Sequence, residues 1–346
     1  MNGVLIIDKP SGLTSHDVVN RVRRILGQRS IGHLGTLDPM ATGVLPLVLG
    51  SFTRLAQFYL HSEKTYEGTI RFGFATDTYD AEGEPLETFS NENVGTAKED
   101  AGTENKNVGT VALACPTLNL AQLQQLATEF LGVIQQTPPP FSAKKIKGVP
   151  AYKLARKHQP VDLKPVEVEI KEFAITAIDA DRATFRARVA SGTYMRSVAH
   201  DLGQRLGCGA HLATLRRTSV AEFDLNHAHM LEELAEYGGR DSSTPARMRS
   251  LPLRMTDLRT IDVALCIHPR ELLPQLPCVT ADELTAVRIR NGRPINLPDH
   301  SRARQVKVFA NQRDLIAIAT RVAGTLFHPK IVFATDECGA DAFVRD

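Results

Sequence analysis

Apolar and polar positions recur along the chain with two different periods, and these periods predict a succession of strands and helices. The N-terminal run GVLIIDKPSG indicates a short strand that ends in a turn at residues 9–12. Thr14 and Asp17, three positions apart, are typical of a helix capping box, and apolar side chains then follow at helical spacing as far as Gly27. This segment is therefore predicted to be a strand–turn–helix unit.

Three segments in the next part of the chain carry equally clear signals. Residues 42–49 form an apolar run that predicts a buried strand, and residues 64–76 alternate well enough to predict another. Asn119 is expected to cap a helix that Gly132 closes. The sequence thus predicts strands and helices mixed along one domain.

The second half of the chain begins with a strand and a helix and ends differently. Alternation over residues 185–189 predicts a half-buried strand, after which the chain bends at Gly192 into a helix. From about residue 270 the pattern consists of short strands separated by turn residues, which indicates a separate β-rich module. Three such strands are expected at residues 305–309, 315–319 and 330–333.

The length of 346 residues fits two domains of ordinary size, which we place at residues 1–265 and 270–346. A polar segment containing the repeat NVGT predicts an exposed, flexible insertion at residues 88–112. Residues 137–158 are rich in proline and basic side chains and predict a loop that leads into a short helix. Residues 238–250 are also expected to form a loop.

Composition excludes several classes of protein. No run of 18 apolar residues is present, so no transmembrane helix is expected, and the N-terminus lacks the basic start of a secretory signal. A cytoplasmic protein is the expectation. The five cysteines are odd in number, widely spaced and without a CxxC pair, which favours neither a disulfide framework nor a zinc site. No metal or other cofactor is expected.

The net charge of +2 does not by itself indicate a nucleic-acid-binding protein, but the distribution of charge does. Residues 144–171 hold seven lysines and one arginine against three acidic residues. A second basic cluster lies near the C-terminus, in a segment whose one acidic residue is Asp299. It consists of Arg288, Arg290, Arg293, Arg302 and Arg304. Taken alone, each patch is explained equally well by a solvated charged face.

The most informative stretch is residues 31–50, IGHLGTLDPMATGVLPLVLG, which places Asp38 between a glycine-rich approach and a proline. The run GHLGTLDPMATGVLP resembles the signature of the TruB family of tRNA pseudouridine synthases. Five further motifs match that family in the same order, namely DKP at 8–10, KTYEG at 64–68, PPPFSAKK at 138–145, SGTYMRSVAHDLG at 191–203 and GCGAHLATLRR at 207–217.

The resemblance covers roughly residues 2–235, and residues 281–295 resemble part of the PUA module that follows in this family. It implies an α+β fold, with a mixed, largely antiparallel sheet flanked by helices and then a small β-rich PUA-like domain. It also implies that Asp38 is the catalytic nucleophile. Breaking a glycosidic bond needs a group that stabilises positive charge on the sugar or forms a covalent adduct, and a carboxylate can do either. The alternative is an aspartate that caps a turn before Pro39.

The resemblance assigns two further catalytic residues. Arg196 corresponds to the arginine that pairs with the nucleophile, and such a partner would keep a carboxylate ionised in a dry pocket. Tyr66 corresponds to the active-site tyrosine, whose ring can stack on the extruded uracil. A surface arginine and a core aromatic residue are the alternatives for these two positions.

The remaining candidates are predicted to bind the RNA. His33 resembles a histidine that fills the space left by the flipped base, and Tyr194 and Leu215 resemble pocket walls. Candidate phosphate contacts are Lys9, Lys144, Lys145 and Lys147, with Phe141 and Tyr152 interleaved for stacking. Ordinary packing or solvation is an open alternative for each of these side chains.

Together these features predict a stand-alone synthase that isomerises uridine 55 in the T-loop of tRNA, with the T-arm stem-loop as sufficient substrate. No cofactor is expected, because the reaction is an isomerisation. No obligatory protein partner is expected either. Two rivals are a guide-RNA-dependent homologue and a non-catalytic tRNA-binding or RNA-folding protein on the same scaffold. The lysine-rich loop disfavours the first, and the complete set of Asp38, Tyr66 and Arg196 disfavours the second.

Overall fold

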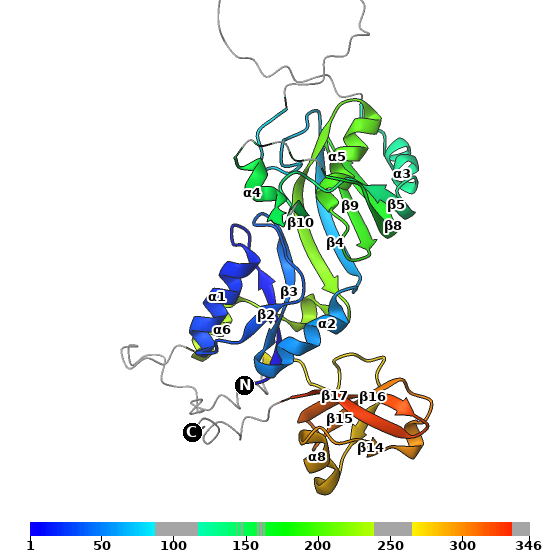
Figure 1. Ribbon diagram of the computed structural model, residues 1–346. Coiled ribbons are helices and arrows are strands. Elements are labelled where there is room, and N and C mark those ends of the chain that lie inside the picture. The colour runs from blue at the N-terminus through cyan, green and yellow to red at the C-terminus, as the bar shows by residue number, and fades with distance from the viewer. Residues whose placement is uncertain are drawn as a thin grey trace, which may run out of the picture. The chain divides into compact units, whose positions relative to one another are not determined.

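The computed structural model describes residues 1–86, 117–142, 144–146, 148–157, 159, 161, 163–238 and 265–333 (Figure 1). The predicted insertion at 88–112 and most of the predicted loop at 238–250 therefore lie outside the described residues. The chain divides into two compact units, residues 1–62 with 218–346, and residues 63–217. In the described ranges, no helix is long and apolar enough to cross a membrane.

The first unit opens with the predicted strand–turn–helix. The capping box is confirmed, because the Thr14 hydroxyl accepts from the Asp17 amide while the Asp17 carboxylate accepts from the Thr14 amide. The helix ends at Leu26, and Gly27 follows with φ of 60°, a left-handed conformation that favours glycine. The elements up to residue 62 are β1 (Gly3–Lys9), α1 (Ser15–Leu26), β2 (Ile31–His33), β3 (Thr42–Leu49), a 3-10 helix (Gly50–Leu55) and α2 (Ala56–Tyr59).

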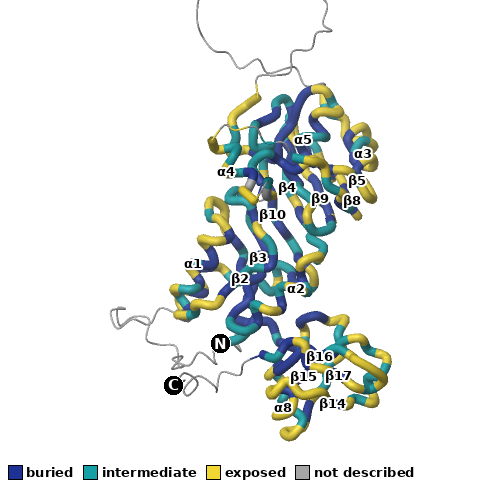
Figure 2. Tube along the Cα trace, in the orientation of Figure 1, coloured by how far each residue is buried: buried dark blue, intermediate teal, exposed yellow. Residues whose placement is uncertain are grey.

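Strands of a mixed, ten-stranded sheet form the centre of this part of the unit. β1 pairs antiparallel with β3 along its whole length and parallel with β12, and β2 pairs antiparallel with β3. Seven of the eight side chains of β3 are buried, as its unbroken apolar pattern predicts (Figure 2). The later elements of this part are β11 (Phe223–Asp224), a 3-10 helix (Leu225–His227), β12 (Ala228–His229) and α6 (Leu231–Gly238).

The β-rich C-terminal module belongs to the same unit and confirms the predicted fold class. Its five strands lie in the order β13–β15–β16–β17–β14. Its elements are β13 (Cys278–Thr280), α8 (Glu283–Arg290), β14 (Ile295–Asn296), a 3-10 helix (Pro298–His300), β15 (Gln305–Phe309), β16 (Leu315–Ala323) and β17 (Leu326–Val332). The three strands expected here are thus confirmed. The predicted boundary between residues 265 and 270 stays a prediction.

Apolar packing and buried polar contacts join this module to the N-terminal segment. Phe52 and Phe333 meet edge to face with ring centroids 5.0 Å apart, and the Ile267 amide donates to the Val4 carbonyl at 2.8 Å. The Tyr59 hydroxyl donates to Glu222 at 2.6 Å, and the Leu273 amide donates to the same carboxylate oxygen at 2.8 Å. Burial and the negative charge of Glu222 raise the pKa of Tyr59.

The second unit is built around a sheet with the strand order β10–β4–β9–β8–β5. β4 with β9, β9 with β8, and β8 with β5 all pair antiparallel. The elements are β4 (Lys64–Phe72), α3 (Leu120–Thr128), β5 (Gly132–Gln136), β6 (Lys145–Ile146), β7 (Val149–Pro150), α4 (Ala151–Ala155), β8 (Val166–Asp179), β9 (Arg182–Val189), α5 (Met195–Leu206) and β10 (Ala210–Val220).

Two sequence predictions in this unit needed correction at their ends. Asn119 caps α3 as predicted, but the helix ends at Thr128, and Gly132 with φ of 84° begins β5 instead of closing the helix. The strand predicted over 64–76 ends at Phe72, because Gly73 has φ of 107° and turns the chain into a loop. The half-buried strand at 185–189 is confirmed, since inward and outward side chains alternate along β9.

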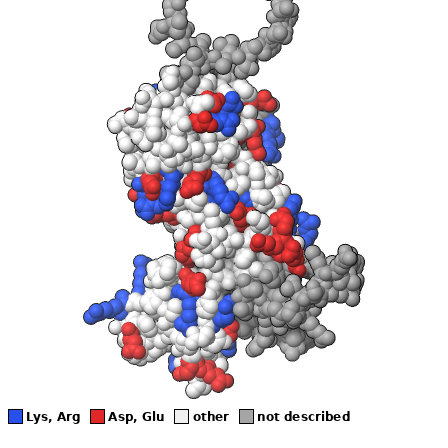
Figure 3. All heavy atoms as spheres, turned by 180° about the vertical axis from the view of Figure 1, so that it is seen from behind, with Lys and Arg blue, Asp and Glu red and all other residues white. Residues whose placement is uncertain are grey.

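The polar side chains of this sheet are paired. Arg71 binds Asp181 at 2.7 Å and Lys171 binds Glu63 at 2.5 Å, and all four side chains are partly exposed. In the view of Figure 3, basic and acidic side chains are interspersed. Exposed pairs of this kind contribute little to stability, about 0–1 kcal/mol each.

Candidate active site

Asp38 lies in the loop that connects β2 to β3 and is half-buried. The hydroxyl of Ser15, the first residue of α1, accepts from the Leu37 amide at 2.8 Å and donates to the Leu37 carbonyl at 3.2 Å. On the other side of Asp38, the Pro39 carbonyl accepts from the Gly12 amide at 2.9 Å. The strand–turn–helix unit therefore fixes the backbone on both sides of the predicted nucleophile.

Lys9 contributes to the same support from the end of β1. Its side chain is fully buried, and its ammonium group donates to the carbonyls of Pro10, Leu13 and Pro39 at 2.8, 2.6 and 3.1 Å. A phosphate contact requires an accessible ammonium group, whereas this one is enclosed by backbone oxygens. The geometry favours a structural role for Lys9, and we omit it from the RNA-contacting residues proposed below.

His33 ends β2, where it is paired with Leu47 of β3. Its side chain is half-buried, and it lies five residues before Asp38 on the same connection. The first unit thus carries two of the predicted site residues, His33 and Asp38, on one short segment between two strands.

Tyr66 and Leu215 are buried side chains of the second unit, 7% and 8% exposed, on β4 and β10. Two positions after Tyr66, a Cβ atom at Gly68 would collide with the Thr214 carbonyl, so the KTYEG motif needs a glycine where the two strands approach. Lys64 opens the same strand. Burial, and secondarily the charge of Arg217, lower the pKa of Lys64 to about 8.

Arg196 lies in the first turn of α5 and is 5% exposed. Its guanidinium group donates to the Thr78 carbonyl and to the Phe141 carbonyl, each at 3.0 Å, and lies 3.5 Å from a carboxylate oxygen of Asp80. A buried arginine bound by several oxygens is held in one orientation. The sequence alternative of an ordinary surface arginine is therefore wrong.

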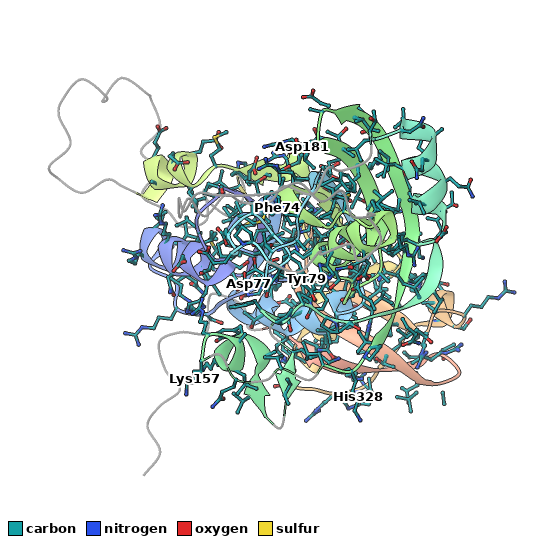
Figure 4. The ribbon with its side chains drawn as sticks, turned by 90° about the horizontal axis from the view of Figure 1, so that it is seen from above. Phe74, Asp77, Tyr79, Lys157, Asp181 and His328 are labelled. Atoms are coloured by element: carbon teal, nitrogen blue, oxygen red, sulfur yellow. The ribbon has the colours of Figure 1, made fainter. Side chains whose placement is uncertain are left out.

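Asp80 is the centre of the loop that follows β4, on which Figure 4 labels Phe74, Asp77 and Tyr79. It is 4% exposed, and one of its carboxylate oxygens accepts from the Thr78 hydroxyl at 2.6 Å and the Glu82 amide at 3.0 Å. Buried carboxylates are paired in this way because an unpaired one is costly. The sequence analysis did not identify Asp80.

Tyr194 is half-buried at the N-cap of α5 and is held by a side chain that the sequence analysis also missed. The Gln136 carboxamide accepts from the Tyr194 amide at 2.8 Å and donates to the Tyr194 carbonyl at 3.1 Å. The Ser197 hydroxyl donates to the Thr137 carbonyl at 2.7 Å. A glutamine two residues before the PPPF motif is the only signal that the sequence offered.

The predicted RNA-binding loop begins at this point. Lys144 is exposed, and the side chains of Lys145 and Lys147 lie outside the described residues. Two short strands, β6 and β7, form a hairpin that the sequence analysis did not predict, and α4 is the predicted short helix. Tyr152 of α4 is half-buried, with the Arg156 guanidinium 5.6 Å from its ring centroid.

Two family models match this chain. The N-terminal domain of TruB family pseudouridylate synthases matches residues 23–105 and 93–195, and the C-terminal domain of tRNA pseudouridylate synthase B matches residues 196–264. A protein from Solibacter usitatus named tRNA pseudouridine synthase B is 44% identical over 335 residues, which are 96% of this chain and 100% of the relative. The chain belongs to the TruB family. A relative of the same name from Thermobifida fusca is 39% identical, covering 96% of this chain and 99% of the relative.

Two solved structures share the fold of this chain and confirm the predicted fold class. A crystal structure of a Cbf5–Nop10–Gar1 complex has a chain with a TM-score of 0.62 at 22% identity, covering 97% of this chain and 86% of that one. An H/ACA ribonucleoprotein bound to a substrate RNA containing 2′-deoxyuridine gives a TM-score of 0.61 at 21% identity, with coverages of 96% and 85%. At these identities the likeness concerns the fold alone. As a TruB family member, the chain is a pseudouridine synthase, an isomerase.

Proposed function

We propose that this TruB family enzyme isomerises uridine to pseudouridine in tRNA, at uridine 55 of the T-loop, and acts in the cytoplasm. The observation that carries this proposal is the identity of 44% to a tRNA pseudouridine synthase B along 96% of the chain. The Asp38 loop adds physical support, because its backbone is fixed on both sides by buried contacts. Fixed positioning is what a catalytic group needs to act on a substrate in one orientation.

In this proposal Asp38 is the nucleophile. The N1–C1′ bond of the uridine breaks, the uracil turns, and a C5–C1′ bond forms, while the C5 proton is lost and N1 gains a proton. A carboxylate can stabilise the sugar cation or form a covalent adduct with the sugar or the base, and either path retains the uracil in the pocket. Both paths end in the same isomer.

We propose Arg196 and Tyr66 as the other catalytic residues. The Arg196 guanidinium would pair with the Asp38 carboxylate and keep it ionised, and Tyr66 would stack on the flipped uracil. Extruding a base costs a few kcal/mol, and His33 would offset part of that cost by filling the gap. Tyr194 and Leu215 would line the pocket.

The proposed RNA surface consists of the loop at residues 137–158, with Lys144 and Lys145 as phosphate contacts, and of the PUA-like domain at residues 270–346. The T-arm stem-loop is the proposed recognition element. Lysines on exposed loops contribute to RNA affinity mainly through release of counterions, so binding should weaken steeply with salt. No protein partner is required in this proposal.

A tritium-release assay tests the proposal. Purified protein without guide RNA or partner proteins is mixed with a T-loop transcript labelled at C5 of uridine, and release of tritium reports the new bond. We expect one tritium to be released from each transcript, and none when uridine 55 is replaced by cytidine. Release that requires a guide RNA would support the guide-dependent rival instead.

Asp38→Asn tests the nucleophile. It should bind tRNA as the parent protein does and release no tritium. Asp181→Asn is the matched control, because it removes an exposed carboxylate that forms an ion pair with Arg71 at 2.7 Å. Continued turnover by Asp38→Asn would rule out Asp38 as the nucleophile, and absence of turnover in the parent protein would favour the non-catalytic rival.

A further inference from the structure

The base of the RNA-binding loop is fastened to the helix that carries Arg196. Gln136, the last residue of β5, is 1% exposed, and its carboxamide makes two hydrogen bonds to the backbone of Tyr194. Tyr194 is the N-cap of α5 and stands two residues before Arg196. A carboxamide that both donates to and accepts from one residue fixes the distance and the rotation of the two segments.

A second contact lies one residue after Arg196. Ser197 is 1% exposed, and its hydroxyl donates to the carbonyl of Thr137 at 2.7 Å. The end of β5 and the residue after it are therefore attached to α5 on both sides of Arg196. Gln136 binds Tyr194, two residues before Arg196, and Thr137 binds Ser197, one residue after it. The same segment then reaches Phe141, whose carbonyl accepts from the Arg196 guanidinium at 3.0 Å.

The other contacts of the Arg196 guanidinium are with Thr78 and Asp80, which lie in a loop that is stabilised by its own hydrogen bonds. Asp80 accepts from the Thr78 hydroxyl and from the Glu82 amide. The conformation of this loop therefore does not depend on Gln136. The segment that carries the Phe141 carbonyl is held from both sides: Gln136 and Thr137 bind α5, and the Ser142 carbonyl accepts from the Tyr152 amide at 3.0 Å. The attachments at Gln136 and Ser197 therefore help to place this carbonyl relative to Arg196.

We propose that Gln136 is a positioning residue for the pseudouridine synthase reaction, which sets the orientation of the Arg196 guanidinium and links it to the RNA-binding loop. The linkage continues beyond Phe141, because the carbonyl of Ser142 accepts from the Tyr152 amide at 3.0 Å and the carbonyl of Lys144 accepts from the Ala151 amide at 2.7 Å. Contact of RNA with the loop is thereby connected through backbone to the arginine. This inference rests on the proposed function.

Gln136→Met tests the proposal. Methionine has a similar length and volume but forms no hydrogen bond, so the Tyr194 amide loses the Gln136 acceptor and the Tyr194 carbonyl loses the Gln136 donor. The Tyr194 carbonyl keeps the Val198 amide as a donor at 3.2 Å. We expect the single-turnover rate at saturating enzyme to fall roughly 10- to 100-fold, as expected when buried polar groups lose their partners. Ser197→Ala, which removes one hydrogen bond with little change in volume, should lower the rate about 5-fold.

Gln124→Met is the matched control. Gln124 lies on α3 of the same unit, and its carboxamide donates to the Ile175 carbonyl at 3.1 Å, so it is also a glutamine bound to backbone. The rate of this variant should stay within 2-fold of the parent. All three variants should bind the T-arm stem-loop with a Kd within about 3-fold of the parent, since none of them changes a charge or an exposed RNA contact.

A double-mutant cycle separates positioning from a general structural effect. If Gln136 acts through Arg196, then Gln136→Met should change the residual rate of Arg196→Lys by less than about 3-fold, because the planar group that it positions has already gone. Folding is monitored by thermal melting, and rates are measured well below the lowest Tm of the set.

The outcomes are distinct. A loss of rate in Gln136→Met that vanishes in the Arg196→Lys background supports the proposal. An unchanged rate, a change confined to Kd, or a loss of equal size in both backgrounds overturns it. If the parent protein itself forms no pseudouridine in the T-arm transcript, the proposed function is wrong. The activity of the parent protein therefore distinguishes a failure of the proposed function from a failure of the Gln136 proposal.

Discussion

Replacing Lys9 with methionine tests whether this lysine stabilises the fold or contacts RNA. The ammonium group is fully buried and donates to three backbone carbonyls. Methionine removes the charge and all three hydrogen bonds while roughly keeping the length of the side chain. We expect a lower Tm, a lower stability of the Asp38 loop, and a tRNA affinity close to that of the parent protein.

The magnitude follows from what the substitution leaves behind. The Pro10 and Leu13 carbonyls lose the Lys9 ammonium as a donor, whereas the Pro39 carbonyl keeps the Gly12 amide at 2.9 Å. Buried polar groups without a partner cost about 1–3 kcal/mol each, and removal of the buried charge offsets part of this, so a net loss of about 3 kcal/mol is expected. At about 2–4 °C for each kcal/mol, the Tm should fall by roughly 6–12 °C.

The assay combines thermal melting with tRNA binding at several salt concentrations, and Lys144→Met serves as the control. Lys144 is exposed, so its replacement should leave Tm unchanged and make the slope of log K against log salt less negative by about 0.7–0.9. If Lys9→Met instead leaves Tm within 2 °C and reduces the salt slope by that amount, Lys9 binds phosphate and the structural reasoning is refuted.

Three further substitutions have defined outcomes. Tyr59→Phe takes a donor from the half-buried Glu222 carboxylate and should lower stability by about 1–2 kcal/mol in denaturant unfolding, with no change in turnover at saturating tRNA. Burial raises the pKa of Asp201 from 3.8 to about 6, so its ionisation is less favourable in the folded than in the unfolded state. The resulting loss of folding stability grows from about pH 4 to pH 6 and is constant above that. Asp201→Asn should therefore raise Tm by about 2–4 °C at pH 7, roughly 1 kcal/mol after allowance for solvent screening, and leave it unchanged at pH 4. Asp80→Asn removes the anion beside Arg196 and should lower the single-turnover rate about 10-fold with Kd unchanged; a normal rate would show that Arg196 does not need this partner.

Local signals in the sequence sufficed where an element is defined by its own residues. The capping box of α1, the buried strand β3 and the alternation of β9 are each determined by side chains that lie within the element. Resemblance to a family supplied the candidate residues, and the fold class followed from it. These predictions concern short stretches in which residue type, spacing and structure are directly related.

Other features depend on residues that are distant in the sequence. The end of α3 at Thr128 was missed because a glycine four residues later is compatible with either a helix end or a strand start. The hairpin of β6 and β7 is too short to show a period. Lys9 was a candidate phosphate contact, whereas its ammonium group donates to the nearby carbonyls of Pro10 and Leu13 and to the carbonyl of Pro39, 30 residues away.

The support of the candidate site was the least predictable part, and the reason is chemical. Lys9, Ser15, Gln136 and Arg196 all make their long-range contacts largely to backbone carbonyls or amides. Every residue offers a carbonyl, so the accepting position leaves no mark in the sequence, and only the donor side chain can be recognised. A motif can therefore identify the residues proposed to act on the uridine. The residues that hold them become visible only when the backbone of one segment is seen against the side chain of another.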